Sequence, residues 1–162
     1  MRYADITTCD IANGKNIGVV LWCQGCSLNC PGCQNKYTHA FTEGKEFTNI
    51  EEDLIINELS KPHITRLTLS GGHPLEYYNI EACFALCKRV KEEIPDIEIW
   101  CYTGWTWEYV KDADIMEYID VLVDGPYNET LRDITLPWCG SKNQRIIDVK
   151  ASIKSNKIVL YK

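Results

Sequence analysis

The stretch IGVVLWCQGCSLNCPGC, Ile17 to Cys33, predicts a buried β-strand that runs directly into a cysteine-rich loop. Residues 17–22 are apolar and rich in β-branched side chains, which is typical of a strand covered on both faces. Four cysteines then follow within eleven residues, at positions 23, 26, 30 and 33. This pattern raises two questions: which sheet the strand belongs to, and what chemistry needs so many thiols.

Strands and helices are expected to alternate along the rest of the chain. Thr48 and Glu51 form a capping box that begins a helix, which we expect to bury Ile50, Leu54, Ile55 and Leu59. Further strands are expected at 64–70, 97–103 and 119–124, and further helices at 80–94 and around 107–118. Near-continuous apolar strands separated by helices predict an α/β fold with a parallel sheet. The units are too few for an eight-stranded barrel of about 250 residues, which favours an open sheet or partial (βα) barrel.

The length of 162 residues predicts a single domain that covers residues 1–162. Within it, residues 126–162 are expected to form a C-terminal extension that packs on the sheet. Two strand-like runs in this extension, 145–149 and 157–161, are expected to form a hairpin or a sheet edge.

Composition and charge exclude several classes of function. Hydrophobic residues make up 45% and charged residues 25%, as in ordinary globular proteins. The net charge of -6 argues against a nucleic-acid partner, which would require a basic surface. No apolar run approaches the roughly 20 residues that cross a membrane, and the N-terminus lacks the layout of a secretory signal. We therefore expect a cytoplasmic protein with no membrane partner, whose nine cysteines are reduced thiols or metal ligands.

Glycine-containing turns and polar residues follow each expected parallel strand. The cysteine loop follows the first strand, and the later strands end at Gly71-Gly72-His73-Pro74, Thr103-Gly104 and Asp124-Gly125. Because the carboxyl ends of parallel strands share one edge, where ligands bind in α/β proteins, we expect a single site there.

The spacing of the thiols allows more than one metal. Structural zinc usually takes two pairs of ligands from separated stretches, whereas the pairs Cys23/Cys26 and Cys30/Cys33 are close together in the chain. The triplet Cys26, Cys30 and Cys33 instead suits a 4Fe-4S cluster held by three thiolates, with one iron left open. Buried structural thiols are a third reading, and we expect Cys23, at the strand end, to face the core.

The triplet Cys26-x3-Cys30-x2-Cys33 resembles the signature of the radical S-adenosylmethionine enzymes, and the Gly71–Pro74 turn resembles their second motif. The match narrows to the anaerobic ribonucleoside-triphosphate reductase activating proteins, small activases that install a glycyl radical in a reductase. It rests also on Asp10–Gly14, Tyr102–Gly104, Val121–Gly125 and Gly140–Arg145, with Trp138. Three positions depart from the pattern: His73 replaces a common acidic residue, Gly32 replaces an aromatic one as in the reductase activases, and Cys139 stands where arginine is frequent.

The resemblance implies an enzyme of the oxidoreductase class whose cofactors do the hard chemistry. Cys26, Cys30 and Cys33 would hold one 4Fe-4S cluster, and the open iron would bind S-adenosyl-L-methionine. The residues expected along that cofactor are Gly32, Gln34, Gly71, Gly72, His73, Pro74, Thr103 and Asp124. Thr103 and Asp124 are included because they end strands at the shared edge, although an aspartate before Gly-Pro is also ordinary turn chemistry.

The resemblance also implies partners. The anaerobic reductase would be the protein substrate and a flavodoxin-type protein the electron donor; a homodimer is also compatible with the sequence. Two alternatives stay open at this point: an activase of another glycyl-radical enzyme, of the formate-lyase type, and a non-catalytic cysteine module that binds zinc or an iron–sulfur cluster.

Overall fold

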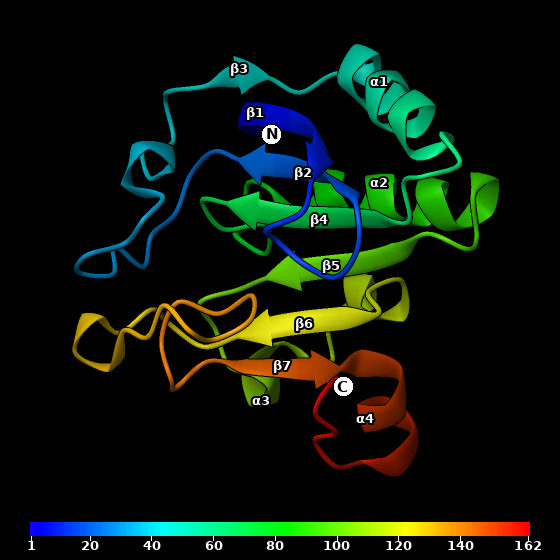
Figure 1. Ribbon diagram of the computed structural model, residues 1–162. Helices are drawn as coiled ribbons and strands as arrows, with labels where there is room; N and C mark the ends of the chain where they lie inside the picture. Colours follow the sequence, from blue (N-terminus) through cyan, green and yellow to red (C-terminus); the bar gives the residue numbers. More distant parts are fainter.

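Seven strands form one open sheet in the computed structural model, which describes residues 1–162 (Figure 1). The order is β3-β1-β2-β4-β5-β6-β7. The central strands are parallel: β2 (Gly18–Cys23), β4 (Arg66–Gly71), β5 (Glu98–Tyr102) and β6 (Val121–Asp124). The outer strands are antiparallel to their neighbours: β1 (Arg2–Asp10), β3 (Lys45–Glu46) and β7 (Arg145–Asp148). The expected open α/β sheet is therefore confirmed.

Two longer helices connect successive parallel strands along the chain, as the alternating pattern predicts. They are α1 (Asn49–Leu59) and α2 (Ile80–Glu93), and two shorter helices follow, α3 (Trp107–Val110) and α4 (Val149–Ser155). Three 3-10 turns complete the set: η1 (Lys36–Thr38), η2 (Asp114–Glu117) and η3 (Glu129–Leu131). No helix combines the length and the apolar character that crossing a membrane requires.

Helix α1 starts as expected but buries a different stripe of side chains. The capping box at Thr48 and Glu51 is present. However, Ile50 and Leu54 are 77% and 43% exposed, and the helix buries Ile55, Ile56 and Leu59 instead. The expectation for Ile50 and Leu54 is therefore wrong. Its physical reason is that α1 packs over β1 and β2, toward one end of the sheet, where only a narrow stripe of the helix meets the core.

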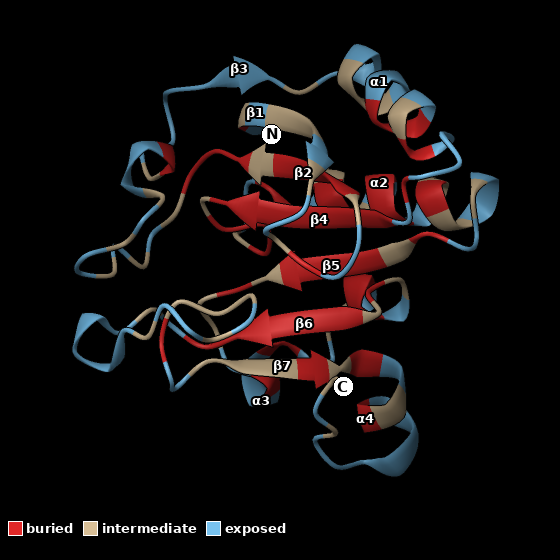
Figure 2. Cartoon of the chain, in the orientation of Figure 1, coloured by how far each residue is buried: buried red, intermediate tan, exposed pale blue.

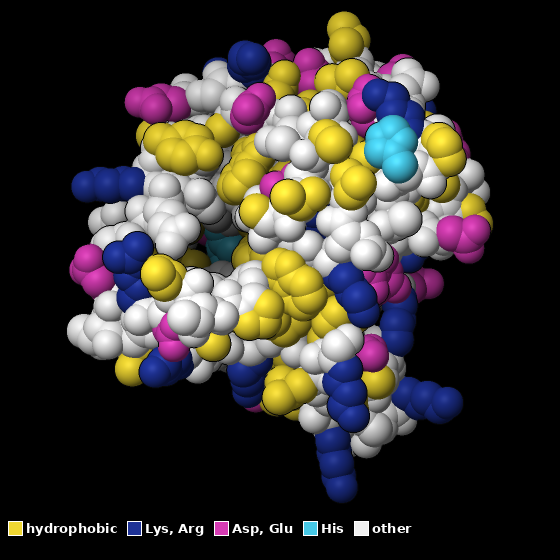
Figure 3. Space-filling view, in the orientation of Figure 1, with side chains coloured by type: hydrophobic (Ala, Val, Ile, Leu, Met, Phe, Trp, Pro, Cys, Tyr) yellow, Lys and Arg dark blue, Asp and Glu magenta, His cyan; other side chains and the backbone are white.

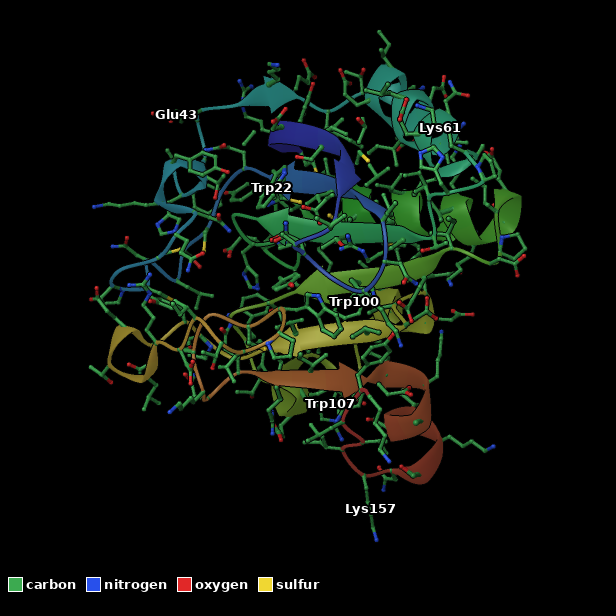
Figure 4. All side chains as sticks on the ribbon, in the orientation of Figure 1. Trp22, Glu43, Lys61, Trp100, Trp107 and Lys157 are labelled. Carbon is green, nitrogen blue, oxygen red and sulfur yellow. The ribbon has the colours of Figure 1, made fainter.

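The two faces of the sheet bury different side chains, because successive residues of a strand point to opposite sides. The face that the helices cover carries the main apolar core, which includes Leu21, Leu67 and Leu69. The opposite face carries a smaller apolar cluster around Trp100, Val121 and Val123. Both groups are buried, so the central strands are buried along most of their length (Figure 2). Figure 4 labels Trp100 between β5 and β6, in the middle of the sheet.

Of three elements expected in the second half of the chain, two differ from the expectation and one agrees with it. The single helix expected at 107–118 is broken into α3 and η2, because Ala113 adopts an extended backbone with φ -75° and ψ 136°. The run at 145–149 supplies the expected edge strand, β7, against β6. The run at 157–161 forms only an isolated bridge, Ile147 to Leu160, because α4 intervenes with Asp148 as its N-cap.

Strand β1 is the longest element that the sequence pattern missed; β3 and α4 were also not expected. Strand β1 runs for nine residues and pairs with β2 and β3. Its side chains are mostly exposed or half-buried, so it shows neither the apolar run nor the clear alternation that marks a strand.

Candidate metal centre and adjoining cleft

The loops that follow the parallel strands meet at one edge of the sheet, on the left in Figure 1. Backbone hydrogen bonds join them directly. The amide of Gly72 donates to the carbonyl of Cys23 at 2.8 Å, and that of His73 donates to Gly25 at 2.9 Å. The amide of Thr103 donates to the carbonyl of Val123 at 2.9 Å. The cysteine loop and the glycine turn are thus one hydrogen-bonded unit.

The two glycines of the turn are needed because the chain passes so close to the cysteine loop. Gly71 has φ +93°, a backbone conformation that favours glycine, and a Cβ there would lie 2.7 Å from the Cys23 carbonyl oxygen. A Cβ on Gly72 would lie 2.6 Å from the Gly25 carbonyl oxygen. The buried Asn79 amide adds a second tie, because its Nδ2 donates to the carbonyls of Gln24 and His73 at 3.0 Å each. The glycine turn therefore packs directly against the cysteine loop and is hydrogen-bonded to it.

The thiols of Cys26, Cys30 and Cys33 are all half-buried. Burial raises the pKa of the Cys26 thiol, although the backbone N–H groups of Leu28 and Asn29 act on it in the opposite direction. Burial likewise raises the pKa of the Cys33 thiol, against the N–H of Asn35. Nowhere in the structure are three or more His, Cys, Asp or Glu side chains close enough together to hold a single metal ion.

The donors of this loop fit an iron–sulfur cluster better than they fit unreactive thiols. Sulfur ligands of such clusters are thiolates, and N–H groups directed at the sulfur stabilise that negative charge. Gly25 and Gly32 have φ values of +100° and +71°, which let the chain turn tightly between the cysteines. The loop therefore combines soft ligands, backbone donors and partial exposure in one short segment.

Cys23 lies apart from these thiols, in the core. It is fully buried, as expected, and its Sγ is 3.7 Å from Sγ of Cys83 on α2. The hydrogen bond with Cys83, together with burial, raises the pKa of Cys23 well above its usual value. Cys87 and Cys101 are also fully buried in this core. Such thiols behave as small apolar side chains.

A cleft of about 440 Å³ opens beside the cysteine loop, on the face that the helices leave uncovered (Figure 3). Its volume is that of a small-molecule site. Of the residues predicted to bind the cofactors, it contains Cys33 and Gln34. The remaining walls come from the strand ends, the loop after β1 and the C-terminal segment: Ala12, Asn13, Trp22, Asn35, Ser70, Tyr102, Tyr127, Arg132, Asp133, Ile134, Leu136, Trp138, Cys139, Gly140 and Gln144.

His73 is buried rather than exposed on the turn. Its Nε2 lies 2.7 Å from the Thr103 hydroxyl, and its Nδ1 lies 3.1 Å from the Glu76 carboxylate. Burial lowers the pKa of His73, although Glu76 acts in the opposite direction. Ser27, in the cysteine loop, donates to the same Glu76 oxygen at 3.1 Å. His73 thus belongs to a chain of polar contacts that runs from the end of β5 to the cysteine loop.

Thr103, Asp124 and Pro74 are also held inside the protein. The Thr103 hydroxyl accepts from the amide of Trp105 at 3.1 Å in addition to its contact with His73. The Asp124 carboxylate accepts from Arg145 Nε at 3.0 Å and from the amide of Trp107 at 2.7 Å, at the start of α3. Both side chains and Pro74 are buried. Binding of a cofactor by these three residues stays a prediction. The contacts of Thr103 and Asp124 described here are all with other residues of the chain.

Comparison of the sequence with known proteins shows the family to which the chain belongs. Residues 12–147 match the model of the 4Fe-4S single cluster domain family. The anaerobic ribonucleoside-triphosphate reductase-activating protein of Enterobacteria phage T4 is 39% identical, over 90% of this chain and 93% of its own. The protein of that name from Escherichia coli K12 is 38% identical over 89% and 96%, and that from Vibrio cholerae is 39% identical over 90% and 97%.

The chain belongs to the family of the anaerobic ribonucleoside-triphosphate reductase-activating proteins. The resemblance seen in the sequence is thereby confirmed. The match to a 4Fe-4S domain supports an iron–sulfur centre over a zinc module, and the names of these relatives favour the reductase activases over the formate-lyase type.

The sequence segment Asp10–Gly14, which helped to carry the family resemblance, has a structural role that the pattern did not reveal. Arg66 on β4 is fully buried, and its Nη2 donates to the Asp10 carboxylate and the Asp10 carbonyl at 2.9 Å each. Its Nη1 donates to Asn13 and, at 2.6 Å, to the hydroxyl of Thr68. A Cβ on Gly14 would lie 2.5 Å from Arg66 Nη1, so glycine lets the loop close over the guanidinium. The only signal in the sequence was a charge inside an apolar strand.

Aromatic side chains form a large part of the cleft, and the sequence pointed to two of them, Tyr102 and Trp138, only as part of the family resemblance. Trp22 and Tyr102 come from the ends of β2 and β5. The Tyr102 hydroxyl donates to the Trp138 carbonyl at 2.9 Å and so joins the C-terminal segment to the sheet. Cys139 is half-buried beside them, and burial raises its pKa to about 11. Nothing in the structure explains why this position is cysteine.

Proposed function

We propose that this chain activates an anaerobic ribonucleoside-triphosphate reductase by generating a glycyl radical on it. The observation that carries the proposal is the 38–39% identity to activating proteins of that reductase, over nearly the whole of each chain. The half-buried cysteine loop and the adjoining cleft supply the two features that such an activity needs: a place for the cluster and a place for a small cofactor.

Cys26, Cys30 and Cys33 are the proposed ligands of one 4Fe-4S cluster. Their partial exposure and their backbone N–H donors support this assignment, as does the burial of Cys23 beside Cys83. When bound, the cluster supplies the electron that cleaves S-adenosyl-L-methionine to methionine and a 5′-deoxyadenosyl radical, which takes a hydrogen atom from the substrate glycine. The chain itself holds, orients and shields these groups.

The cleft beside Cys33 is the proposed place of S-adenosyl-L-methionine. It joins the polar side chains Gln34, Ser70 and Gln144 to the aromatic rings of Trp22 and Tyr102, which suits a ligand with charged and flat parts. Gly32 is exposed in the cysteine loop next to it. Gly71, Gly72 and His73 fix the cysteine loop against the end of β4 in this proposal, and their contact with the cofactor, like that of Pro74, stays a prediction.

The open rim also suits a large protein substrate. Tyr37 and Tyr77 are 60% and 83% exposed, and they follow the cysteine loop and the glycine turn. A flavodoxin-type protein is the proposed electron donor. A cytoplasmic location, expected from the composition, and a homodimer, with which the sequence is compatible, complete the proposal.

The test is anaerobic formation of the glycyl radical. The protein is loaded with iron and sulfide, reduced, and mixed with S-adenosylmethionine and the reductase, and the radical is followed by electron paramagnetic resonance. We expect a protein-based glycyl radical on the reductase and 5′-deoxyadenosine in solution, and neither product with the variant Cys30→Ala. Formation of 5′-deoxyadenosine without a radical on the reductase would contradict the proposed substrate. Failure to take up any four-iron cluster would contradict the proposed cofactor.

A further inference from the structure

His39 lies against one of the proposed cluster ligands. Its Nε2 is 3.3 Å from Sγ of Cys33, and its Nδ1 is 3.4 Å from Oδ1 of Asn29. The ring is half-buried. Its first contact is with a sulfur atom and its second with an amide that also belongs to the cysteine loop, so both partners of the ring lie within one short segment of chain.

The backbone of His39 is fixed to the same loop. The amide of Cys26 donates to the His39 carbonyl at 3.1 Å, and the amide of His39 donates to the carbonyl of Lys36 at 3.2 Å. The preceding residue, Thr38, is buried, and its hydroxyl donates to the carbonyl of Asn35 at 2.7 Å. These bonds hold the ring beside Cys33 as part of the loop architecture.

The tautomer of the His39 ring depends on whether the Cys33 sulfur can donate a hydrogen bond. A protonated Cys33 thiol can donate to Nε2, and Nδ1–H then donates to Oδ1 of Asn29. A Cys33 thiolate accepts only, so Nε2 carries the proton, and the Asn29 amide turns its NH₂ group toward Nδ1. The exposed position of Asn29 makes that rotation easy. Nε2 therefore becomes a donor to sulfur whenever Cys33 is a metal ligand.

We propose that His39 is a positioning residue that donates a hydrogen bond from Nε2 to the Cys33 sulfur of the cluster-loaded protein and raises the reduction potential of the cluster. This inference rests on the proposed function, because it needs the cluster. A donor to a ligand sulfur stabilises the reduced cluster more than the oxidised one, since reduction adds negative charge. The other donors directed at Cys26 and Cys33 are backbone amides. His39 is a side-chain donor, which a substitution can remove.

The test is an anaerobic redox titration of the cluster-loaded protein, followed by the electron paramagnetic resonance of the reduced cluster, without S-adenosylmethionine or reductase. In His39→Leu we expect the ratio of reduced to oxidised cluster at a fixed potential to fall about tenfold, which is a shift of about 59 mV to more negative values for one electron. His39→Gln keeps an N–H of similar reach, so we expect its potential to stay near that of the wild type. His63→Leu is the matched control, because His63 is exposed in the turn between α1 and β4.

An unchanged potential in His39→Leu overturns the inference, and so does an equal shift in His39→Gln, which would show that ring shape rather than the donor matters. If His39→Leu does not fold or load, pulsed electron paramagnetic resonance of the wild type with ¹⁵N-labelled histidine decides the matter. A weak coupling that is lost in His39→Gln supports the hydrogen bond; a strong coupling, typical of nitrogen bound to iron, or no coupling overturns it. A wild type that takes up no four-iron cluster removes the proposed function itself, whereas a normal cluster with an unchanged potential removes only this inference.

Discussion

The protein has two groups of thiols in contrasting environments, one in the apolar core and one in the loop that follows β2. Cys23, Cys83, Cys87 and Cys101 are fully buried between the sheet and α2. The second group starts only three residues after Cys23 and consists of Cys26, Cys30 and Cys33. Its thiols are half-buried, in a loop that contains two glycines with positive φ. The same side chain is therefore an apolar core residue in one group and a proposed metal ligand in the other. Burial makes the difference, because a thiolate is most costly in the core and less costly in the half-buried loop, where backbone N–H groups partly offset the lost hydration.

The sharpest test of this contrast is to remove one thiol from the loop. Cys30→Ala is expected to abolish uptake of the four-iron cluster, because a cluster held by three thiolates loses one of its ligands. Iron and acid-labile sulfide in the reconstituted protein measure this directly. Cys9→Ala, which removes an exposed thiol from β1, is the control and should leave both contents unchanged. A full cluster in Cys30→Ala would remove this cysteine from the ligand set.

A substitution in the glycine turn tests whether this turn holds the cysteine loop in place. Gly72→Ala places a Cβ 2.6 Å from the Gly25 carbonyl oxygen and 2.8 Å from that of Thr38, so the backbone of the cysteine loop must shift. We expect a loss of about 1–3 kcal/mol in the free energy of unfolding, measured by urea denaturation, as for other overpacked sites. Gly140→Ala, where the closest neighbour of a Cβ would be the Tyr127 ring at 3.0 Å rather than backbone, should cost less. Equal stability of Gly72→Ala and wild type would show that the turn does not support the loop.

The buried group should respond in stability alone. Cys23→Ala leaves a small cavity beside Cys83 and is expected to lower the free energy of unfolding by about 1–2 kcal/mol. Its iron and sulfide contents should equal those of the wild type, and Cys83→Ala should behave in the same way. Loss of the cluster in Cys23→Ala together with a normal cluster in Cys26→Ala would reverse the assignment of the two groups.

The smallest expected effect concerns His73, whose contacts connect β5 to the cysteine loop. Its pKa is lowered from 6.5 in the folded protein, so the unfolded chain binds a proton first as the pH falls. Stability should therefore decrease as the pH drops below 6.5, by at most about 1.4 kcal/mol for each pH unit, until the lower folded pKa is reached. Chemical denaturation at pH 7.5 and 5.5 measures the loss, and His73→Gln should show less of it. The same pH dependence in both proteins would assign the effect to other groups.

The sequence predicts the parallel strands well because their signals are local. The apolar runs of β2, β4, β5 and β6 each end at glycine or a polar residue, and these ends define the edge where the loops meet. Strand β1 escaped prediction because its own sequence shows no apolar run and no clear alternation. Its place in the sheet depends on pairing with β2. The three ligand cysteines were proposed from their spacing, which is also local.

The parts of the site that the sequence did not predict depend on contacts between distant residues. Arg66 meets Asp10 across 56 positions of the chain, and Tyr102 meets Trp138 across 36. No periodicity in either segment reports such a pair. The burial of His73 is similar: its position in a turn suggests exposure, but Thr103 and Trp105 cover the ring from the end of β5.

The most direct test of the central claim, that the loop thiolates hold a cluster with one iron open to a cofactor, is the spectrum of the reduced cluster with and without S-adenosylmethionine. The measurement is anaerobic electron paramagnetic resonance of the reconstituted protein, with 5′-deoxyadenosine measured in the same sample. We predict that S-adenosylmethionine changes the cluster signal and is cleaved. A four-iron cluster whose signal does not change, with no 5′-deoxyadenosine formed, would contradict the account.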